Sequence, residues 1–294
     1  MTTSQEISRL FARSFTRPVF AAMARTGDYR APFSALLQAG LMREGSEATH
    51  TIGSLFDRIS LHLSKNYRNE YIYKNDLASK IIFGRHSPKT AGLQIEIPIG
   101  RSIVDVAVAN GTTTAYEIKT EFDTSRRLNS QTTDYLKAFD QVYVVTHPAH
   151  VTRFEKELDP RVGVIVLTKT GTMRTLRSAT GNAEHVDPCV IFRCLRRGEY
   201  LHALNKLVGS VPSLPNGLIH AHCESLFSKI SQNDAHRIFT QALRSRTTDQ
   251  ATVEFIKQLP ASLRALGYGT PLSARQRGEV LALLSKKVSL TLSI

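Results

Sequence analysis

The chain has 294 residues, and its 38 Lys and Arg outnumber its 25 Asp and Glu, which gives a formal net charge of +13 and a sequence pI of about 9.9. So large a positive balance indicates a polyanionic partner such as nucleic acid. No stretch is apolar over the length that a membrane-spanning helix needs, and the N-terminus lacks the apolar segment of a secretory signal. We therefore expect a cytoplasmic protein that does not enter a membrane.

Residues 1–68 are expected to form an N-terminal helical region. Pro18 can begin a short helix that ends near Gly27, and a second helix is expected over residues 31–39. A helix-turn-helix DNA reader is one interpretation of this region, but small helices joined by short loops are more often plain packing. Further apolar residues at helical spacing predict one buried helix face: Ile52, Leu55, Phe56, Ile59 and Leu63.

A central segment, residues 69–180, begins with a helix expected over residues 69–84. A polar and basic loop follows, in which Arg85, His86 and Lys89 are candidates for contact with phosphate, although a solvated turn is the more common interpretation of such a loop. Residues 94–97 then alternate between polar and apolar side chains, which is typical of a strand.

Residues 103–119 are the most informative stretch, because they place an aspartate on one apolar strand and Glu-Ile-Lys on the next. Side chains alternate faces along a strand, so Asp105 and Glu117 share a face only if the turn between the strands has an odd number of residues. A three-residue loop with Gly111 at positive φ would pair Asp105 with Ala115. We therefore predict an odd-length turn that brings both carboxylates to one face.

These carboxylates and the neighbouring Lys119 ammonium suit a particular chemistry. Carboxylate and phosphate oxygens are the ligands that a hard divalent cation such as Mg2+ or Mn2+ prefers. Such an ion lowers the pKa of bound water, and a lysine beside it can hold or deprotonate that water. The pattern predicts hydrolysis of phosphodiester bonds, with a surface hairpin that carries ordinary charges as the alternative.

The string of Asp105, eleven further residues, Glu117, one residue and Lys119 on a hairpin resembles the core of the PD-(D/E)XK, or restriction-endonuclease-like, nuclease superfamily. The resemblance implies that Asp105 and Glu117 bind metal and that the backbone carbonyl of Ile118 adds a ligand. It also implies that Lys119 serves the nucleophilic water. Val104 stands where the superfamily has its usual proline, as in divergent members.

The resemblance implies further site residues. Members of the superfamily carry a Gln-x3-Tyr pair on the helix after the hairpin, matched here by Gln131 and Tyr135. They also supply a glutamate from the helix before the first strand, for which Glu70 is preferred over Asp76, although an acid at a helix N-terminus is also favoured by the helix dipole. The residues expected to contact nucleic acid are Arg85, His86, Arg126 and Arg127.

Two continuous β-branched runs, residues 141–147 and 162–168, predict strands buried on both faces. With the preceding elements they give the order helix, three antiparallel strands, helix, strand, strand, which is that of the superfamily. The expected fold is α/β: a restriction-endonuclease-like core over residues 69–180 with a central mixed sheet flanked by helices, plus N-terminal helices and a helical C-terminal lobe.

The C-terminal lobe, residues 185–294, is helical by its apolar spacing and follows a polar, glycine-containing boundary. It is expected to select a substrate, or to form a homodimer or bind a partner subunit. Cys189, Cys194 and Cys223 all lie in it, but their spacing matches no standard zinc finger, so buried thiols are the preferred interpretation.

Together these patterns predict a metal-dependent nuclease, an endonuclease rather than an exonuclease, that acts on DNA with Mg2+ or Mn2+. Its expected role is restriction, anti-phage defence or repair. One alternative is a protein of nuclease fold that binds nucleic acid or a partner without cleavage, and another is an RNA-cleaving toxin.

Overall fold

The computed structural model describes residues 4–30, 32–34, 50–168 and 170–288. The chain forms two compact units. The helical unit consists of Met1–Arg85 together with Gln250–Ile294, and the sheet unit is the continuous stretch His86–Asp249. The two units have other bounds than the expected segments 1–68, 69–180 and 185–294, because the helices that follow residue 185 are divided between both units.

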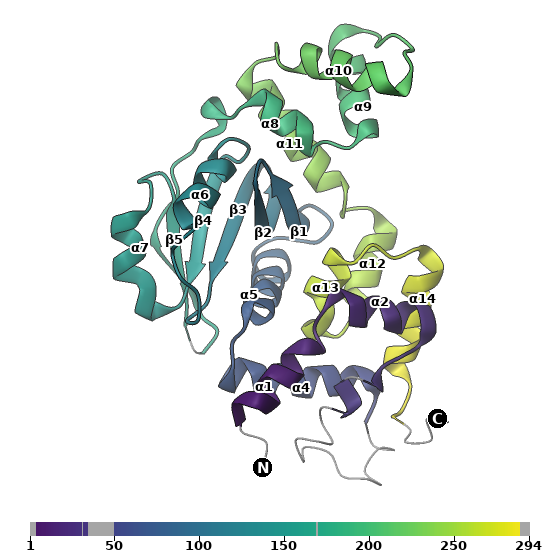
Figure 1. Cartoon of the computed structure of the whole chain (residues 1–294). Helices are drawn as coiled ribbons and strands as arrows, with labels where there is room; N and C mark the ends of the chain where they lie inside the picture. Colours follow the sequence, from purple (N-terminus) through teal and green to yellow (C-terminus); the bar gives the residue numbers. More distant parts are fainter. Residues whose placement is uncertain (1–3, 31, 35–49, 169, 289–294) are drawn as a thin grey trace. The chain divides into compact units, whose positions relative to one another are not determined.

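The sheet unit is built on a six-stranded mixed sheet whose spatial order is the order along the chain (Figure 1). Its strands are β1 (Gly92–Ile99), β2 (Ser102–Asn110), β3 (Thr112–Lys119), β4 (Gln141–Thr146), β5 (Gly163–Leu167) and β6 (Met173–Arg177). β1 to β3 are antiparallel, β3 to β5 are parallel, and β6 is antiparallel to β5. The expected mixed α/β architecture is therefore confirmed. The edge strand β6 was not expected, since its side chains are largely exposed and lack an apolar run.

The turn between β2 and β3 has an odd length, as predicted, but the register is different. Asn110 pairs with Thr112, which leaves Gly111 alone at the tip with a φ of 76°. One step beyond the pair of Val106 and Tyr116, the same ladder places Asp105 opposite Glu117, two positions past the expected partner. The turn is this short because a glycine at positive φ can reverse the chain without steric cost.

Helices α6 (Leu128–Leu136), α8 (Pro188–Cys194) and α11 (Gln232–Ser245) pack against the strands. α11 contacts β1, β2 and β3, where small residues let it come close: Ala107, Ala109 and Ala115 belong to its buried cluster. At Gly92 the approach is so tight that a Cβ atom would lie 2.5 Å from the Cα atom of Arg244. α11 is thus held firmly on the sheet.

The remaining helices of the sheet unit are α7 (Val151–Glu157), which packs on β5, α9 (Arg197–Val208) and α10 (Asn216–Phe227). Short 3-10 segments, η3 (Pro148–His150) and η4 (Ala183–His185), connect the elements. α8, α9 and α10 meet around the buried Phe192, whose ring centroid lies 4.8 Å from that of Tyr200 and 5.6 Å from that of Phe227. Aromatic packing therefore stabilises the arrangement of α8, α9 and α10.

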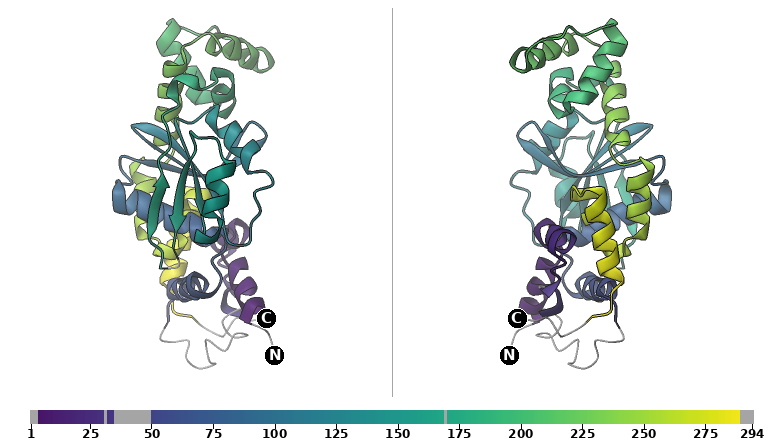
Figure 2. Two further views of the ribbon diagram at one scale, coloured as in Figure 1. Left: turned by 90° about the vertical axis from the view of Figure 1, so that its left-hand side faces the viewer. Right: turned by 90° about the vertical axis from the view of Figure 1, so that its right-hand side faces the viewer.

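The helical unit combines segments from both ends of the chain. Its helices are α1 (Ser4–Arg13), α2 (Arg17–Thr26), α4 (Ile52–Asn66), α5 (Glu70–Leu77), which continues as the π-helical segment η2 (Ala78–Arg85), α12 (Gln250–Gln258), η5 (Ala261–Leu263), α13 (Arg264–Gly269) and α14 (Ala274–Ser285). α2 lies beside α14 (Figure 2). The Tyr71 hydroxyl donates a hydrogen bond of 2.6 Å to the Ser262 carbonyl, and the Asn75 amide donates one of 2.9 Å to the Ala261 carbonyl.

Most of the helix expected over residues 31–39 lies outside the described residues. The helix expected over residues 69–84 is present, but it changes from α to π geometry after Leu77.

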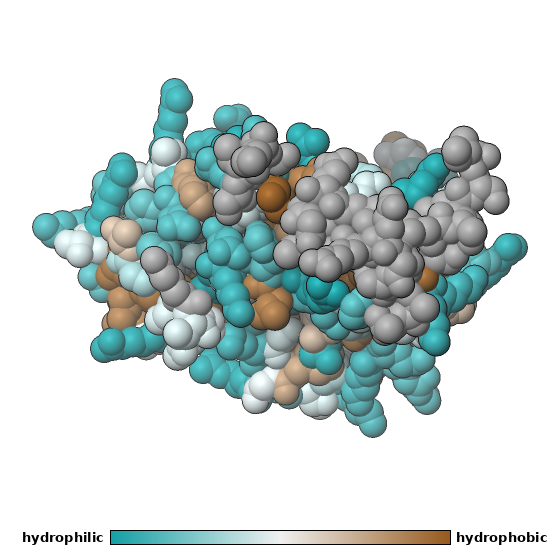
Figure 3. All heavy atoms as spheres, turned by 90° about the horizontal axis from the view of Figure 1, so that it is seen from below, coloured by the Kyte–Doolittle hydropathy of each residue, from teal (hydrophilic) through white to brown (hydrophobic). Residues whose placement is uncertain are grey.

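Seen from below, the molecule shows mainly hydrophilic side chains, with hydrophobic ones in small separate groups (Figure 3). Within the described ranges we find no helix of the length and apolarity required to cross a membrane.

Candidate functional site

A buried polar network lies at the end of β3. Glu117 is only 2% exposed, and its Oε1 atom accepts from the Lys119 ammonium at 2.6 Å. Lys119 also donates to the Gln131 side-chain oxygen at 3.1 Å. The Tyr135 hydroxyl lies 2.6 Å from Glu117 Oε2 and 2.6 Å from the Ile103 carbonyl oxygen. Both carboxylate oxygens of Glu117 are therefore engaged by side chains of the chain itself.

Asp105 adjoins this network through the backbone. Its Oδ2 atom accepts a hydrogen bond of 2.8 Å from the N–H of Ile118. The structure thus brings together five of the expected site residues, Asp105, Glu117, Lys119, Gln131 and Tyr135, on β2, β3 and α6. The Ile118 atom that faces the aspartate is the backbone nitrogen, whereas the predicted metal ligand was the carbonyl.

Burial and charge shape the network. Burial, and then the negative charge of Glu117, raise the pKa of the Tyr135 hydroxyl, so this group stays protonated and can donate. The Glu117 carboxylate is buried away from water, so it needs the Lys119 ammonium as its compensating charge. The arrangement is a closed network that stabilises one geometry of β3 and α6.

The donor set offers the expected Mg2+ or Mn2+ no free oxygen of Glu117. Both Glu117 oxygens already accept hydrogen bonds, so an ion could bind there only if Lys119 or Tyr135 moved away. Over the ranges that the structure describes, no cluster of three or more His, Cys, Asp or Glu side chains is placed to hold a metal. Mg2+ binding stays a prediction, with Asp105 and Glu117 as its ligands.

Several expected site residues have other surroundings. Glu70 lies in the helical unit, where it forms an ion pair with Lys74 on the next turn of α5. Arg85 ends η2 in that same unit. In the sheet unit, His86 Nδ1 lies 2.9 Å from the Asn110 amide nitrogen. Arg126 is exposed in the turn before α6.

A groove of about 1070 Å3 opens next to the buried network. We call it the basic groove, because its lining contains four cationic side chains and one acid. It is formed by the β1–β2 turn, α6 and the end of α8. Its charged residues are Arg101, Arg127, Lys137, Arg193 and Asp134.

The acid of the basic groove is already neutralised. Asp134 accepts from Lys137 at 3.0 Å, from the Ser102 hydroxyl at 2.8 Å and from the Arg101 N–H at 3.3 Å. Burial alone would raise the pKa of Asp134, but the hydrogen bonds from Lys137 and Ser102 outweigh it and hold this pKa below its usual value. Arg193 pairs with Glu224 at 2.9 Å, whereas no acid among the described residues pairs with Arg101 or Arg127.

Gln131 joins the two features. Its side chain lines the basic groove and accepts from Lys119 of the buried network. Among the expected residues, Arg127 also lines the groove, whereas Arg101, Lys137 and Arg193 were missed. One available signal was the spacing of Asp134 on α6 and of Arg127 and Lys137, which flank this helix, since a helix would place all three on one face. The contribution of α8 has no local signal.

A family model described as Bacteriophage P4 protein cII matches residues 64–266, more than half of the chain. The chain belongs to this family. Among curated proteins, protein cII of Enterobacteria phage P4 is 24% identical over 155 residues, which make up 52% of this chain and 51% of that protein. The chain thus spans about half the length of this cII relative. No solved structure matches the chain.

The cII match overturns the nuclease assignment. The matching family is a phage protein family, and no PD-(D/E)XK nuclease family matches. The predicted membership of that superfamily is wrong, and so are the predictions of a metal-dependent phosphodiesterase or endonuclease and of a role in restriction, defence or repair. The physical reason for the error is that Glu-x-Lys on a strand also arises as a buried ion pair, as in this network. The restriction-endonuclease-like topology is not confirmed by any solved structure.

Proposed function

We propose that this member of the cII family binds DNA and that the backbone of the DNA lies in the basic groove. The observation that carries the proposal is the imbalance of charge in the groove. Lys137 pairs with Asp134 and Arg193 with Glu224, which leaves Arg101 and Arg127 without an acid among the described residues. Arginine and lysine in a groove of this kind suit phosphate oxygens, and each contact releases counterions from the nucleic acid.

The buried network fixes α6, which forms one wall of the basic groove. Lys119 donates to the Gln131 side chain, and the Tyr135 hydroxyl lies within hydrogen-bond distance of both Glu117 and the Ile103 carbonyl. These contacts keep α6 in position relative to β2 and β3. A groove whose walls are fixed in this way binds with less loss of conformational entropy. The proposal therefore assigns the network a positioning role. The expected cytoplasmic location and the expected homodimer or partner subunit remain predictions beside it.

The test is fluorescence anisotropy with a short labelled DNA duplex at salt concentrations between about 50 and 200 mM. We expect the affinity to fall steeply with salt. Arg101→Ala and Arg127→Ala should each weaken binding and reduce the slope of log K against log salt by about 0.9. The matched control is Arg153→Ala on α7, an exposed arginine paired with Glu157 outside the groove.

Absence of binding to any duplex at low salt would refute the proposal. Equal losses in the groove variants and in Arg153→Ala would refute the assignment to the groove. A labelled RNA duplex and single strands of both kinds complete the set, and tighter binding of RNA than of DNA would replace DNA as the ligand.

A further inference from the structure

α11 carries a row of exposed side chains that is separate from the basic groove. Arg237, Gln241 and Arg244 are exposed, and their spacing of four and three residues places them on one face of the helix. From first to last they cover about 10 Å of helix axis, which is close to three base-pair steps of DNA. We call these three residues the α11 stripe.

The opposite side of α11 is buried and fixed. Ile238, Phe239, Ala242 and Leu243 belong to the core of the sheet unit, and the helix contacts β1, β2 and β3. The Ser231 side chain caps the first turn of the helix by accepting from the Asp234 N–H at 3.1 Å. The stripe is therefore presented by a rigid element, as a recognition surface requires.

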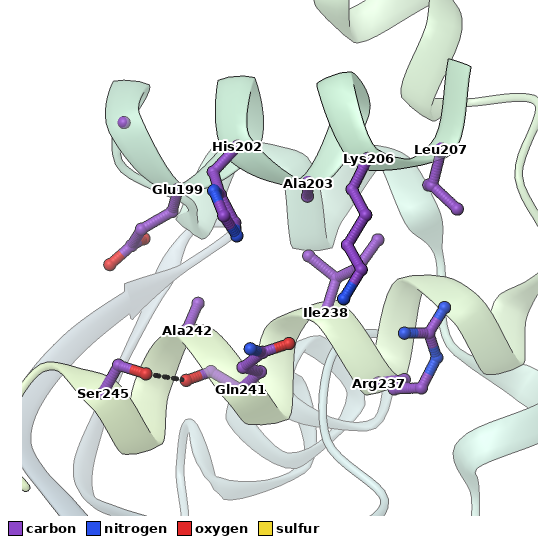
Figure 4. Close-up of a pocket in the computed structure, with 11 residues that line it drawn as sticks. Glu199, His202, Ala203, Lys206, Leu207, Arg237, Ile238, Gln241, Ala242 and Ser245 are labelled. Carbon is purple, nitrogen blue, oxygen red and sulfur yellow. Dashed lines mark hydrogen bonds between the residues drawn. The ribbon is translucent and has the colours of Figure 1, made fainter. Parts of the chain in front are cut away.

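Hollows lie on both sides of the stripe. One, of about 430 Å3, separates α9 from α11, and His202 and Lys206 extend from α9 toward α11 across it (Figure 4). The other, of about 450 Å3, lies between α11 and the β2–β3 tip at Gly111. Arg237 and Gln241 line both hollows, so the stripe is a ridge with space on either side.

The charge around the ridge is positive. Of the residues that the structure describes, Glu199 is the only acid that lines the hollows, and Arg246 binds it through two hydrogen bonds of 2.6 and 2.7 Å. Arg237 pairs with Asp234 at 2.7 Å, but both side chains are well exposed, and such pairs contribute little. Within the described part of the chain, Lys206 and Arg244 pair with no acid. A polyanion can therefore approach from this side.

We propose that the α11 stripe reads base edges in the major groove of DNA. An α-helix fits that groove, arginine can bind guanine through two hydrogen bonds, and glutamine can bind adenine in the same manner. Phosphate attraction alone requires only positive charge, whereas the stripe places the neutral Gln241 amide between the two arginines. Lys206, across the hollow from the stripe, would contact a phosphate. This inference rests on the proposed DNA binding and adds sequence preference to it.

The test is selection of preferred sites by the full chain from a duplex library with a random centre. Wild-type protein should enrich a motif. Gln241→Ala should weaken binding to the enriched site about tenfold and relax the preference at one position, because it removes a bidentate base contact. Since this substitution changes no charge, the affinity for a scrambled duplex should stay within about threefold. The matched control is Gln232→Ala, an exposed glutamine in the first turn of α11.

Arg237→Lys and Arg244→Lys provide a second readout, since lysine keeps the charge but cannot reproduce the planar two-bond contact. Each should change the enriched motif while the salt dependence is retained. If wild-type protein binds DNA but enriches no motif, or if the stripe variants enrich the wild-type motif, the inference is wrong and DNA binding through the basic groove stands. If wild-type protein binds no DNA, the proposed function itself fails.

Discussion

The Lys119 ammonium lies 2.6 Å from the Glu117 carboxylate, and these two residues are separated by a single position on β3. Glu117 is 2% exposed and the Lys119 side chain 13%, so the pair has largely left water. Alternate residues of a strand share a face, which allows the lysine to fold back onto the glutamate. Neither charge can be removed without consequence for the other.

Lys119→Met is expected to destabilise the sheet unit by roughly 3 kcal/mol, because it leaves the Glu117 charge buried without its partner. The combined variant Glu117→Gln/Lys119→Met should recover most of this loss. Urea unfolding followed by circular dichroism measures both. Equal destabilisation in the single and the combined variant would show that the pair is not coupled.

Tyr135→Phe removes the hydroxyl that lies between Glu117 and the Ile103 carbonyl. A hydrogen bond to a charged group contributes about 1.5 to 3 kcal/mol, so we expect a loss of free energy of unfolding in that range. The matched control is Tyr143→Phe, since the Tyr143 hydroxyl forms no hydrogen bond in the described part of the chain. A loss as large in the control would contradict the role given to Tyr135.

His236 gives a prediction for pH. Its Nε2 atom lies 3.0 Å from the Thr113 hydroxyl, and burial lowers its pKa below the usual value although Asp140 acts in the opposite direction. The unfolded chain therefore takes up a proton first, near pH 6.5, and stability should fall as the pH drops below that value until the folded pKa is passed.

His236→Gln should remove this part of the pH dependence while the hydrogen bond to Thr113 can be kept. The measurement is the free energy of unfolding between about pH 7 and 5, the range around the histidine pKa. The control is His185→Gln in η4, where the histidine is exposed. A profile of His236→Gln that still falls like wild type would contradict the assignment.

The predicted magnesium site is tested by thermal unfolding with added MgCl2 or EDTA. Binding to the folded state at about 100 times the dissociation constant adds about 2.7 kcal/mol, so the Tm should rise with Mg2+ and return with EDTA. Asp105→Asn should abolish the rise. The rise of Tm with Mg2+ should be larger in Lys119→Met than in wild type, because Lys119 occupies a Glu117 oxygen in the wild-type protein. An identical response of wild type and Asp105→Asn would place any bound ion elsewhere.

Much of the central hairpin could be predicted from the sequence, because alternation along a strand is a local property. The shared face of Asp105 and Glu117 follows from the odd turn. The register does not, since a one-residue tip at Gly111 and a three-residue loop have the same parity. Parity fixes which face a side chain takes, but it does not fix which residue lies opposite.

Other parts of the molecule have no local signal. Arg193 of α8 reaches the basic groove although it lies far along the chain from Arg127. The hydrogen bond from Tyr71 to Ser262 joins residues 191 positions apart. The surroundings of Glu117 could not be predicted for a related reason: motif spacing reveals an acid and an amine, but it does not reveal that their side chains form a buried ion pair.

The helical unit draws its core from two distant stretches: Phe11, Phe20 and Phe56 pack in the same cluster as Phe255, Ile256 and Leu284. During synthesis the ribosome releases the early helices long before their late partners exist. The aromatic side chains of the early helices therefore stay exposed to solvent while the ribosome synthesises the intervening sheet unit. A nascent chain halted before residue 250 would therefore be a preferred client of chaperones.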